Sequence, residues 1–187
     1  MATDNELMER VKQGDLNQLD LIYQKYSRIL LAFFYRMTFN TSVSEDLVHN
    51  VFIRILRYRD NYHGDGQFST WLFHLAHNIR NDHYRKNRFA HMTDNNVQAL
   101  EIADDQNPAS VYETSERAAI LKGALEELSL EQREVLILSR YHGLKYREIA
   151  DILKCSENTV KARNFRAVEK LRRVYRRLES RHEQETI

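Results

Sequence analysis

The chain has little proline, glycine or cysteine, and each scarcity narrows the structures it can form. Its 187 residues include one proline and five glycines, which favours long helices over a fold rich in turns. The single cysteine, Cys155, cannot form an internal disulfide. There is no run of about 18 apolar residues, so the sequence predicts no transmembrane helix.

A targeting signal is also missing from the sequence. The start, MATDNELMERVKQGD, has neither the basic nor the apolar region of a signal peptide. Together with the single cysteine, this predicts a cytoplasmic protein. With 42% apolar and 29% charged residues, the composition is ordinary for one or two small soluble domains.

The net charge of +1 conceals a separation of charge along the chain. Residues 161–182 contain nine Lys or Arg and two acids, whereas residues 93–116 contain six acids and no Lys or Arg. This pattern predicts a basic end for nucleic acid and an acidic connector that avoids duplex DNA or shields the basic surface. The low net charge indicates that affinity for DNA comes largely from a partner.

The most informative stretch is residues 129–173, which have the pattern of a helix-turn-helix preceded by a supporting helix. Ser129 followed three residues later by Gln132 predicts a capping box, and the apolar run after it predicts a helix that ends near Gly143. A second helix follows in the letters YREIADIL, where Ile149, Ala150 and Leu153 share one face. The small Ala150 permits a close helix crossing.

The turn and the helix after it complete the motif. The turn is Lys154, Cys155 and Ser156, and Ser156 can cap the next helix. The apolar residues of that helix fall on one stripe: Val160, Ala167, Val168, Leu171, Tyr175 and Leu178. An exposed Phe165 between cations suits contact with a thymine methyl beside phosphate and guanine contacts.

We therefore predict a DNA-recognition helix. Its contacting residues are Asn158, Thr159, Lys161, Ala162, Arg163, Phe165, Arg166 and Arg173. The alternative is a helical hairpin whose basic face meets only water, but turn spacing, cap and outer-face composition all favour DNA.

The first part of the chain predicts four helices and one glycine-containing loop. The helices are expected from about Asn5 to Lys12, from a capping box of Asp15 and Gln18 onward, from Glu45 to Asp60, and from Thr70 to Arg88. In the loop NYHGDGQFS, Tyr62, His63 and Phe68 offer flat side chains that can wrap a single unstacked base. The sequence thus predicts an all-α fold of two small helical domains, 1–88 and 117–187, joined by an acidic flexible linker, 89–116.

With these residues in view, the chain resembles the extracytoplasmic-function group of sigma factors, the compact promoter-recognition subunits of bacterial RNA polymerase. The letters SEDLVHNVFIRIL resemble the region-two helix that docks on the polymerase, and FSTWLFHLAHNIRND resembles the segment that handles the melted minus-10 element. Residues 129–172 resemble region four, which reads the minus-35 element as duplex. Two such segments in this order are far more specific than a helix-turn-helix alone.

The resemblance, with the loop described above, implies two further sets of site residues. Contact with core polymerase is expected at Asp46, Leu47, His49, Asn50, Ile53 and Arg54. Contact with the minus-10 strand is expected at Tyr62, His63, Phe68, Asn78, Arg80, Arg85 and Lys86. The sequence departs from the family pattern at Lys154, where many such turns have Gly, and at Ala162, where Ser is common.

The function implied is binding rather than catalysis, since polymerase performs the chemistry. The expected partners are core RNA polymerase, promoter DNA and an anti-sigma factor, which can be membrane-bound, with no small-molecule substrate, cofactor or metal. The alternative is a stand-alone helix-turn-helix transcription regulator with a helical sensing or dimerisation domain. An enzyme acting on nucleic acid ranks last, because no nucleophile with a base and no phosphate-binding loop occurs in the sequence.

Overall fold

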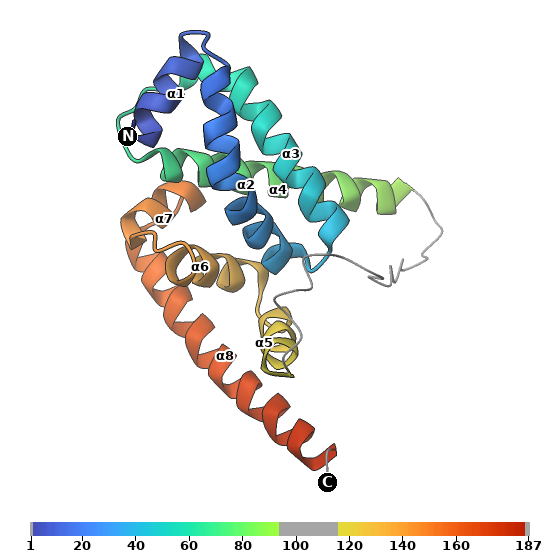
Figure 1. Ribbon diagram of the computed structural model, residues 1–187. Coiled ribbons are helices and arrows are strands. Elements are labelled where there is room, and N and C mark those ends of the chain that lie inside the picture. The colour runs from blue at the N-terminus through green and yellow to red at the C-terminus, as the bar shows by residue number, and fades with distance from the viewer. Residues whose placement is uncertain (1, 94–115, 186–187) are drawn as a thin grey trace. The chain divides into compact units, whose positions relative to one another are not determined.

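The fold is built only of helices in the parts of the chain that the structure describes. The computed structural model describes residues 2–93 and 116–185 (Figure 1). These ranges contain eight α-helices, one short 3-10 helix and no strand, which confirms the predicted all-α class. The helices divide into two compact units, Met1–Ala103 and Asp104–Ile187.

The first unit is a bundle of four α-helices. Its elements are α1 (Asp4–Lys12), α2 (Asn17–Thr38), α3 (Thr41–Tyr58), the 3-10 helix η1 (Arg59–Asn61) and α4 (Phe68–Thr93). The long α2 packs against both α1 and α3, and α3 also packs against α4 (Figure 1). All four helices contribute to the core, whose fully buried residues include Met8, Ile22, Leu30, Phe33, Phe34, Leu47, Ile55 and Leu72.

Local signals explain where most of these helices begin. Thr3 caps α1 in a capping box with Glu6, and Asn40 caps α3 by accepting a hydrogen bond from the Val43 N–H at 2.9 Å. The predicted capping box of Asp15 and Gln18 is wrong. Leu16 is the N-cap of α2 and makes no side-chain cap, because a leucine side chain has no hydrogen-bond acceptor.

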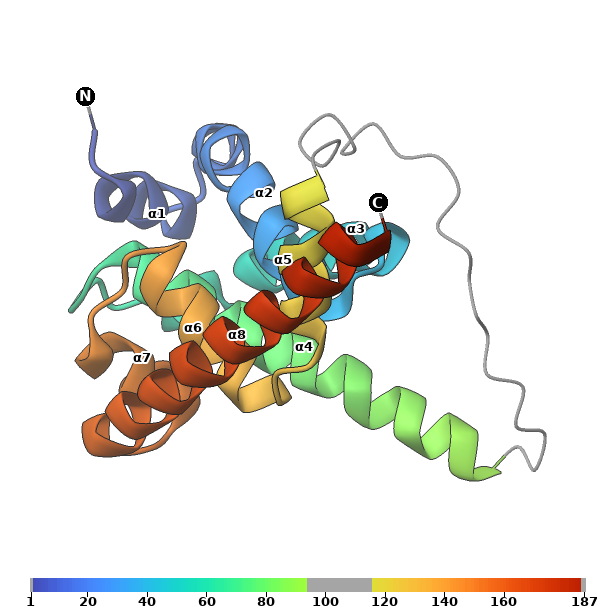
Figure 2. The same cartoon turned by 90° about the horizontal axis from the view of Figure 1, so that it is seen from below.

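The second unit is organised around one long helix. Its elements are α5 (Glu116–Glu126), α6 (Leu130–Arg140), α7 (Tyr146–Leu153) and α8 (Glu157–Glu185), and α8 packs against each of the other three (Figures 1 and 2). A Cβ atom on Gly123 of α5 would lie 3.2 Å from Leu178 Cδ1. Glycine therefore permits the close approach of α5 to α8.

Most of the predicted linker, residues 94–115, lies outside the described residues. α4 continues to Thr93 and so includes the first five residues of the predicted linker, 89–93, and α5 begins at Glu116. The flexibility predicted for the linker and the domain boundaries at 88 and 117 stay predictions.

Candidate nucleic-acid interface

The turn between α7 and α8 has the geometry that its sequence predicts. Ser156 caps α8, since its Oγ accepts a hydrogen bond from the Thr159 N–H at 3.1 Å. Lys154 ends α7 in the left-handed conformation, with φ of +54°. Related turns favour Gly at this place because a left-handed backbone is unstrained only without a side chain.

The N-terminal half of α8 has one inner and one outer face. Val160 and Ala167 are fully buried and Val174 is 3% exposed, so this stripe fixes the rotation of the helix about its axis. The predicted contact residues Asn158, Lys161, Ala162, Phe165, Arg166 and Arg173 are exposed, and Thr159 and Arg163 are half-buried. Phe165 is 69% exposed, the highest value among the large exposed apolar side chains described.

A groove lies beside this outer face, between the start of α6 and the start of α8. It has a volume of about 650 Å³ and is lined by Ser129, Glu131, Gln132, Asn158, Thr159, Ala162, Arg163 and Arg166. The capping box of Ser129 and Gln132 opens α6 there, as predicted. A helix N-terminus and two guanidinium groups favour an anion such as a DNA phosphate.

Two protein carboxylates compete with a phosphate for the cations of this surface. Glu131 Oε2 lies 3.0 Å from Arg163 Nη2 across the groove, and Lys161 forms an ion pair with Glu157 at 2.9 Å. A phosphate bound at either cation would have to displace its protein carboxylate. Exposed ion pairs are weak enough for such an exchange, contributing roughly 0–1 kcal/mol each.

A buried polar residue that the sequence analysis missed holds the three helices of the motif together. Asn164 of α8 is 4% exposed, donates to Tyr146 Oη of α7 at 2.9 Å and accepts from Ser139 Oγ of α6 at 3.1 Å. Its place on α8 between half-buried Arg163 and exposed Phe165 gave no signal of burial. Only the packing of α6 and α7 on this face reveals its role.

In the first unit, two predicted base-stacking residues are buried instead. Tyr62 is 3% and Phe68 is 1% exposed, and their rings pack with Trp71 at centroid distances of 5.0 and 5.8 Å. Aromatic packing takes both side chains into the core, so neither is offered to a base in this structure. His63, between them, is exposed.

The helix after the loop presents only some of the predicted strand-contacting residues. Arg85 and Lys86 are exposed and Asn78 is half-buried, and Arg85 lies 3.1 Å from the Asp82 carboxylate. Arg80 is 2% exposed and donates to Asn81 Oδ1 at 2.9 Å. Packing encloses its guanidinium, so Arg80 is not offered to a strand in this structure.

The predicted polymerase-binding residues lie along the outer side of α3, with one exception. Asp46, His49, Asn50 and Ile53 are exposed, and Arg54 pairs with Asp82 of α4 at 3.1 Å. Leu47 is 1% exposed and belongs to the core, so it is not available to a partner. Tyr23 of α2 is 51% exposed, and the centroid of its ring lies 4.8 Å from that of Phe52 of α3.

The described residues contain neither a cluster of metal ligands nor a membrane-spanning helix. No three His, Cys, Asp or Glu side chains gather there in a way that could hold a metal ion. Among the same residues, no helix combines the length and apolar character that crossing a bilayer requires.

Comparison with known proteins assigns the family. Residues 22–90 match the model of sigma-70 region 2, and residues 118–171 match that of sigma-70 region 4. The chain is 30% identical over 174 residues to the RNA polymerase sigma-H factor of Pseudomonas aeruginosa, covering 89% of this chain and 90% of that protein. It is equally similar, over 176 residues, to the ECF RNA polymerase sigma-E factor of Escherichia coli K12, of which it covers 91%. The chain belongs to the ECF sigma factors.

Solved structures show the same fold in proteins of lower identity to this sigma factor. The sigma factor RpoE of Bartonella quintana, solved in complex with the anti-sigma factor NepR, has a TM-score of 0.73 and 24% identity, over 84% of this chain and 96% of that one. CnrH, solved with the cytosolic domain of CnrY, has a TM-score of 0.69 and 21% identity, over 91% and 96%.

The family assignment gives this sigma factor its general function. It is a promoter-specificity subunit of RNA polymerase, as the resemblance in the sequence implies. α1, residues 4–12, lies outside both matched regions.

Proposed function

We propose that the two units recognise the two promoter elements separately. Residues 1–88 form the domain that binds core polymerase and the melted minus-10 element, residues 117–187 form the domain that binds minus-35 duplex, and residues 89–116 connect them. The two family matches support this division, because each falls within one unit. The stand-alone regulator is disfavoured, because such a protein has no need of region 2.

The observation that carries minus-35 recognition is the outer face of α8. Phe165 is 69% exposed in a helix whose rotation is fixed by the buried Val160 and Ala167. Such an aromatic at the surface of a monomer is explained by an apolar contact with a base edge in the major groove. Asn158, Thr159, Ala162 and Arg166 then face neighbouring bases, while Lys161, Arg163 and Arg173 face phosphates.

For the minus-10 element, the contacts are assigned to the side chains that remain exposed or half-buried. These are His63, Asn78, Arg85 and Lys86. Tyr62, Phe68 and Arg80 support this surface from inside. The cationic side chains contact the backbone of the single strand, and the loop of residues 63–67 holds an unstacked base.

Core polymerase binds along α3 in this proposal. Asp46, His49, Asn50, Ile53 and Arg54 lie on that side, and Ile53 is 40% exposed. An exposed apolar residue among polar ones is typical of a protein-binding surface. The sigma factor acts by binding in the cytoplasm, and polymerase performs the chemistry.

An anti-sigma factor, which can be membrane-bound, is the proposed inhibitory partner. The solved Bartonella protein with this fold is bound to an anti-sigma factor. Affinity purification of this chain from uninduced cells is expected to recover a second small protein in addition to polymerase. Recovery of polymerase alone would count against the partner.

Run-off transcription on genomic fragments tests the function directly. Core polymerase stripped of its own sigma subunit should initiate at defined starts only after this chain is added. The mapped starts would then show a common element at both minus-10 and minus-35. If no starts are seen and the chain alone shifts specific duplex DNA, the regulator reading replaces this one.

A further inference from the structure

The loop between η1 and α4 is exposed in its middle and buried at both ends. Tyr62 and Phe68 are 3% and 1% exposed, whereas residues 63–67 are all exposed. Gly64 has φ of +71°, so the exposed segment turns sharply. The shape of these five residues therefore depends on what holds the loop at its ends and at its turn.

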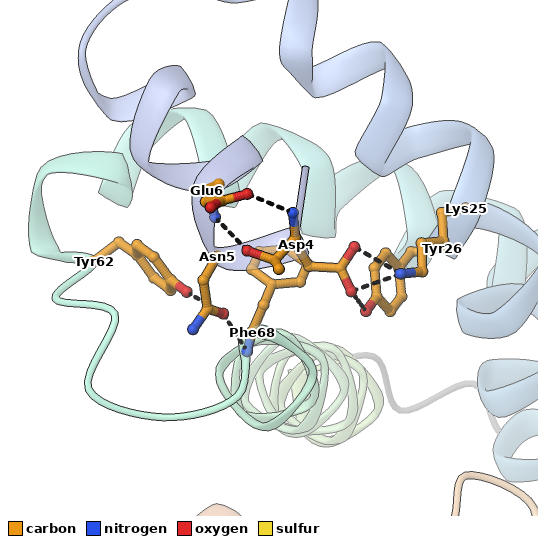
Figure 3. Close-up of polar contacts among 8 residues, drawn as sticks. Asp4, Asn5, Glu6, Lys25, Tyr26, Tyr62 and Phe68 are labelled. Carbon is orange, nitrogen blue, oxygen red and sulfur yellow. Dashed lines mark hydrogen bonds and ion pairs between the residues drawn. The ribbon is translucent and has the colours of Figure 1, made fainter. Parts of the chain in front are cut away.

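One side chain from α1 holds the loop at three points, and Figure 3 shows two of them, at Tyr62 and Phe68. Asn5 Oδ1 accepts hydrogen bonds from Tyr62 Oη and from the Phe68 backbone N–H, both at 2.9 Å. Asn5 Nδ2 donates to the carbonyl oxygen of Gly66 at 2.8 Å. Lys12 adds a bond from Nζ to the Tyr62 carbonyl oxygen at 2.7 Å.

α1 is itself fixed against the rest of the first unit. Its first turn is closed by the Thr3–Glu6 capping box, and its apolar residues Leu7, Met8 and Val11 are buried. Beside Asn5, the Asp4 carboxylate accepts from Lys25 Nζ and Tyr26 Oη of α2, both at 2.7 Å (Figure 3). Asn5 is thus presented to the loop from a helix that has little freedom to move.

A fixed frame around an exposed segment is what a base-selecting loop needs. A flexible loop adapts to any of the four bases, whereas a preorganised loop keeps its polar groups at fixed positions and rejects the bases that do not fit. Stability alone does not require one amide to bond the first, middle and last parts of the same loop.

We propose that Asn5 is a positioning residue for promoter recognition: it sets the conformation of residues 63–67 and thereby the choice of one minus-10 base. α1 then belongs to the promoter-recognition apparatus although it lies outside both family matches. The inference rests on the proposed function, because it assumes that this loop meets the melted strand.

The test compares Asn5→Ala with a matched control, Asp4→Ala. The control removes the hydrogen bonds that Lys25 and Tyr26 of α2 donate to Asp4, and it removes no hydrogen bond between α1 and the loop. Each variant is assembled with core polymerase, and open-complex formation is measured on four promoters that differ in one base, for each position of the minus-10 element. Minus-35 duplex binding and the urea midpoint of each variant are measured alongside.

We expect Asn5→Ala to reduce the preference at one minus-10 position by about fivefold or more, an order typical of one lost base contact. Preference at the other positions and minus-35 binding should change less than twofold. Asp4→Ala should lower the urea midpoint at least as much and leave the preference intact. Asn5→Asp keeps the acceptor for Tyr62 and Phe68 but loses the donor to Gly66, so an intermediate preference is expected.

Two results would overturn the inference. One is a uniform loss of Asn5→Ala activity across all four bases; the other is an equal loss of preference in both alanine variants, because either shows only a structural role. The wild-type protein reports on the proposed function itself. If its complexes show no base preference at minus-10, the proposed function has failed, whatever the variants do.

Discussion

At the scale of the residue, the exposed ring of Phe165 is the side chain whose removal should change promoter choice. An apolar contact with a thymine methyl is lost with the ring, so Phe165→Ala should weaken binding to the preferred duplex by about 1–3 kcal/mol. Binding to random duplex should change less than twofold, since no cation is removed. Fluorescence anisotropy with the two duplexes checks this.

The matched control for that prediction is Tyr141→Ala, at an aromatic that is 43% exposed outside α8. It should leave both affinities unchanged. Equal weakening by Phe165→Ala on both duplexes would show that the ring supports the fold of the unit rather than reading a base.

Glu131 acts on the same surface through charge. Glu131→Gln removes the carboxylate that lies 3.0 Å from Arg163, which leaves the guanidinium for a phosphate. We expect random-duplex affinity to rise about two- to fivefold at low salt, in line with the roughly 0–1 kcal/mol of an exposed ion pair. The slope of log affinity against log salt should steepen by about 1.

A suitable comparison is Glu169→Gln, which loses an exposed carboxylate paired with Arg172 at 3.5 Å and lies outside the groove. If the two variants gain affinity equally, the effect is one of net charge, and the Glu131–Arg163 pair has no particular role.

At the scale of the element, α1 is held in part by the hydrogen bond from Tyr26 to Asp4, which requires the Tyr26 phenol to keep its proton. Burial, and then the hydrogen bond to Asp4, raise the pKa of Tyr26 well above the ordinary value near 10. The folded state keeps this phenol protonated at a pH where the unfolded chain releases the proton. The stabilisation is therefore complete below about pH 10 and is lost as pH rises from there toward the raised pKa.

The direction of this pKa shift gives a prediction for the variant Tyr26→Phe. The variant should lose about 1–2 kcal/mol of unfolding free energy at pH 8, because the Asp4 carboxylate loses one donor. Between pH 10 and 11 the unfolding free energy of the wild-type protein should fall more steeply than that of the variant, by up to about 1.4 kcal/mol per pH unit. Urea unfolding at several pH values measures both, and parallel curves would contradict the assigned cause.

The elements also show which features a sequence can reveal. The caps at Ser129 and Ser156 depend on residues within one turn of each other, so they could be predicted. The burial of Tyr62 and Phe68 depends on Asn5 of α1, which is 57 and 63 residues away from them, so no local pattern connects them. The same limit applies to Asn164, whose partners belong to two other helices.

For charged residues, too, the sequence did not distinguish buried side chains from exposed ones. Arg80 looked like part of a basic helix end but is enclosed by packing, whereas Arg85, five residues later on α4, is exposed. The helical wheel of α8 worked better for the outer face, because the inner side packs on α5, α6 and α7 while Phe165 and Arg166 stay exposed.

On the scale of the whole molecule, charge is divided between the end of the chain and its connector. Residues 161–182 contain nine Lys or Arg, residues 93–116 contain six acids, and the total charge is +1. Acids tethered next to a cationic DNA-binding unit lower its affinity for any duplex, since repulsion from phosphates acts over about a Debye length of 10 Å at 0.1 M salt. A sigma factor with this arrangement should bind DNA poorly before it meets polymerase.

The prediction uses a chain in which five linker acids become amides: Asp94, Glu101, Asp104, Asp105 and Glu113. Its net charge rises from +1 to +6, and Glu116 is kept because it begins α5. The free variant should bind random duplex about tenfold more tightly at 50 mM salt, and the gain should shrink as salt screens it.

A variant with the same acids in permuted order should match the wild-type protein. In complex with core polymerase, promoter preference should persist, because the base contacts that we propose lie on α8 and around the loop of residues 63–67. If the neutralised chain binds random duplex no more tightly, the acids do not shield the basic end, and weak binding by the free chain must come from the domains themselves.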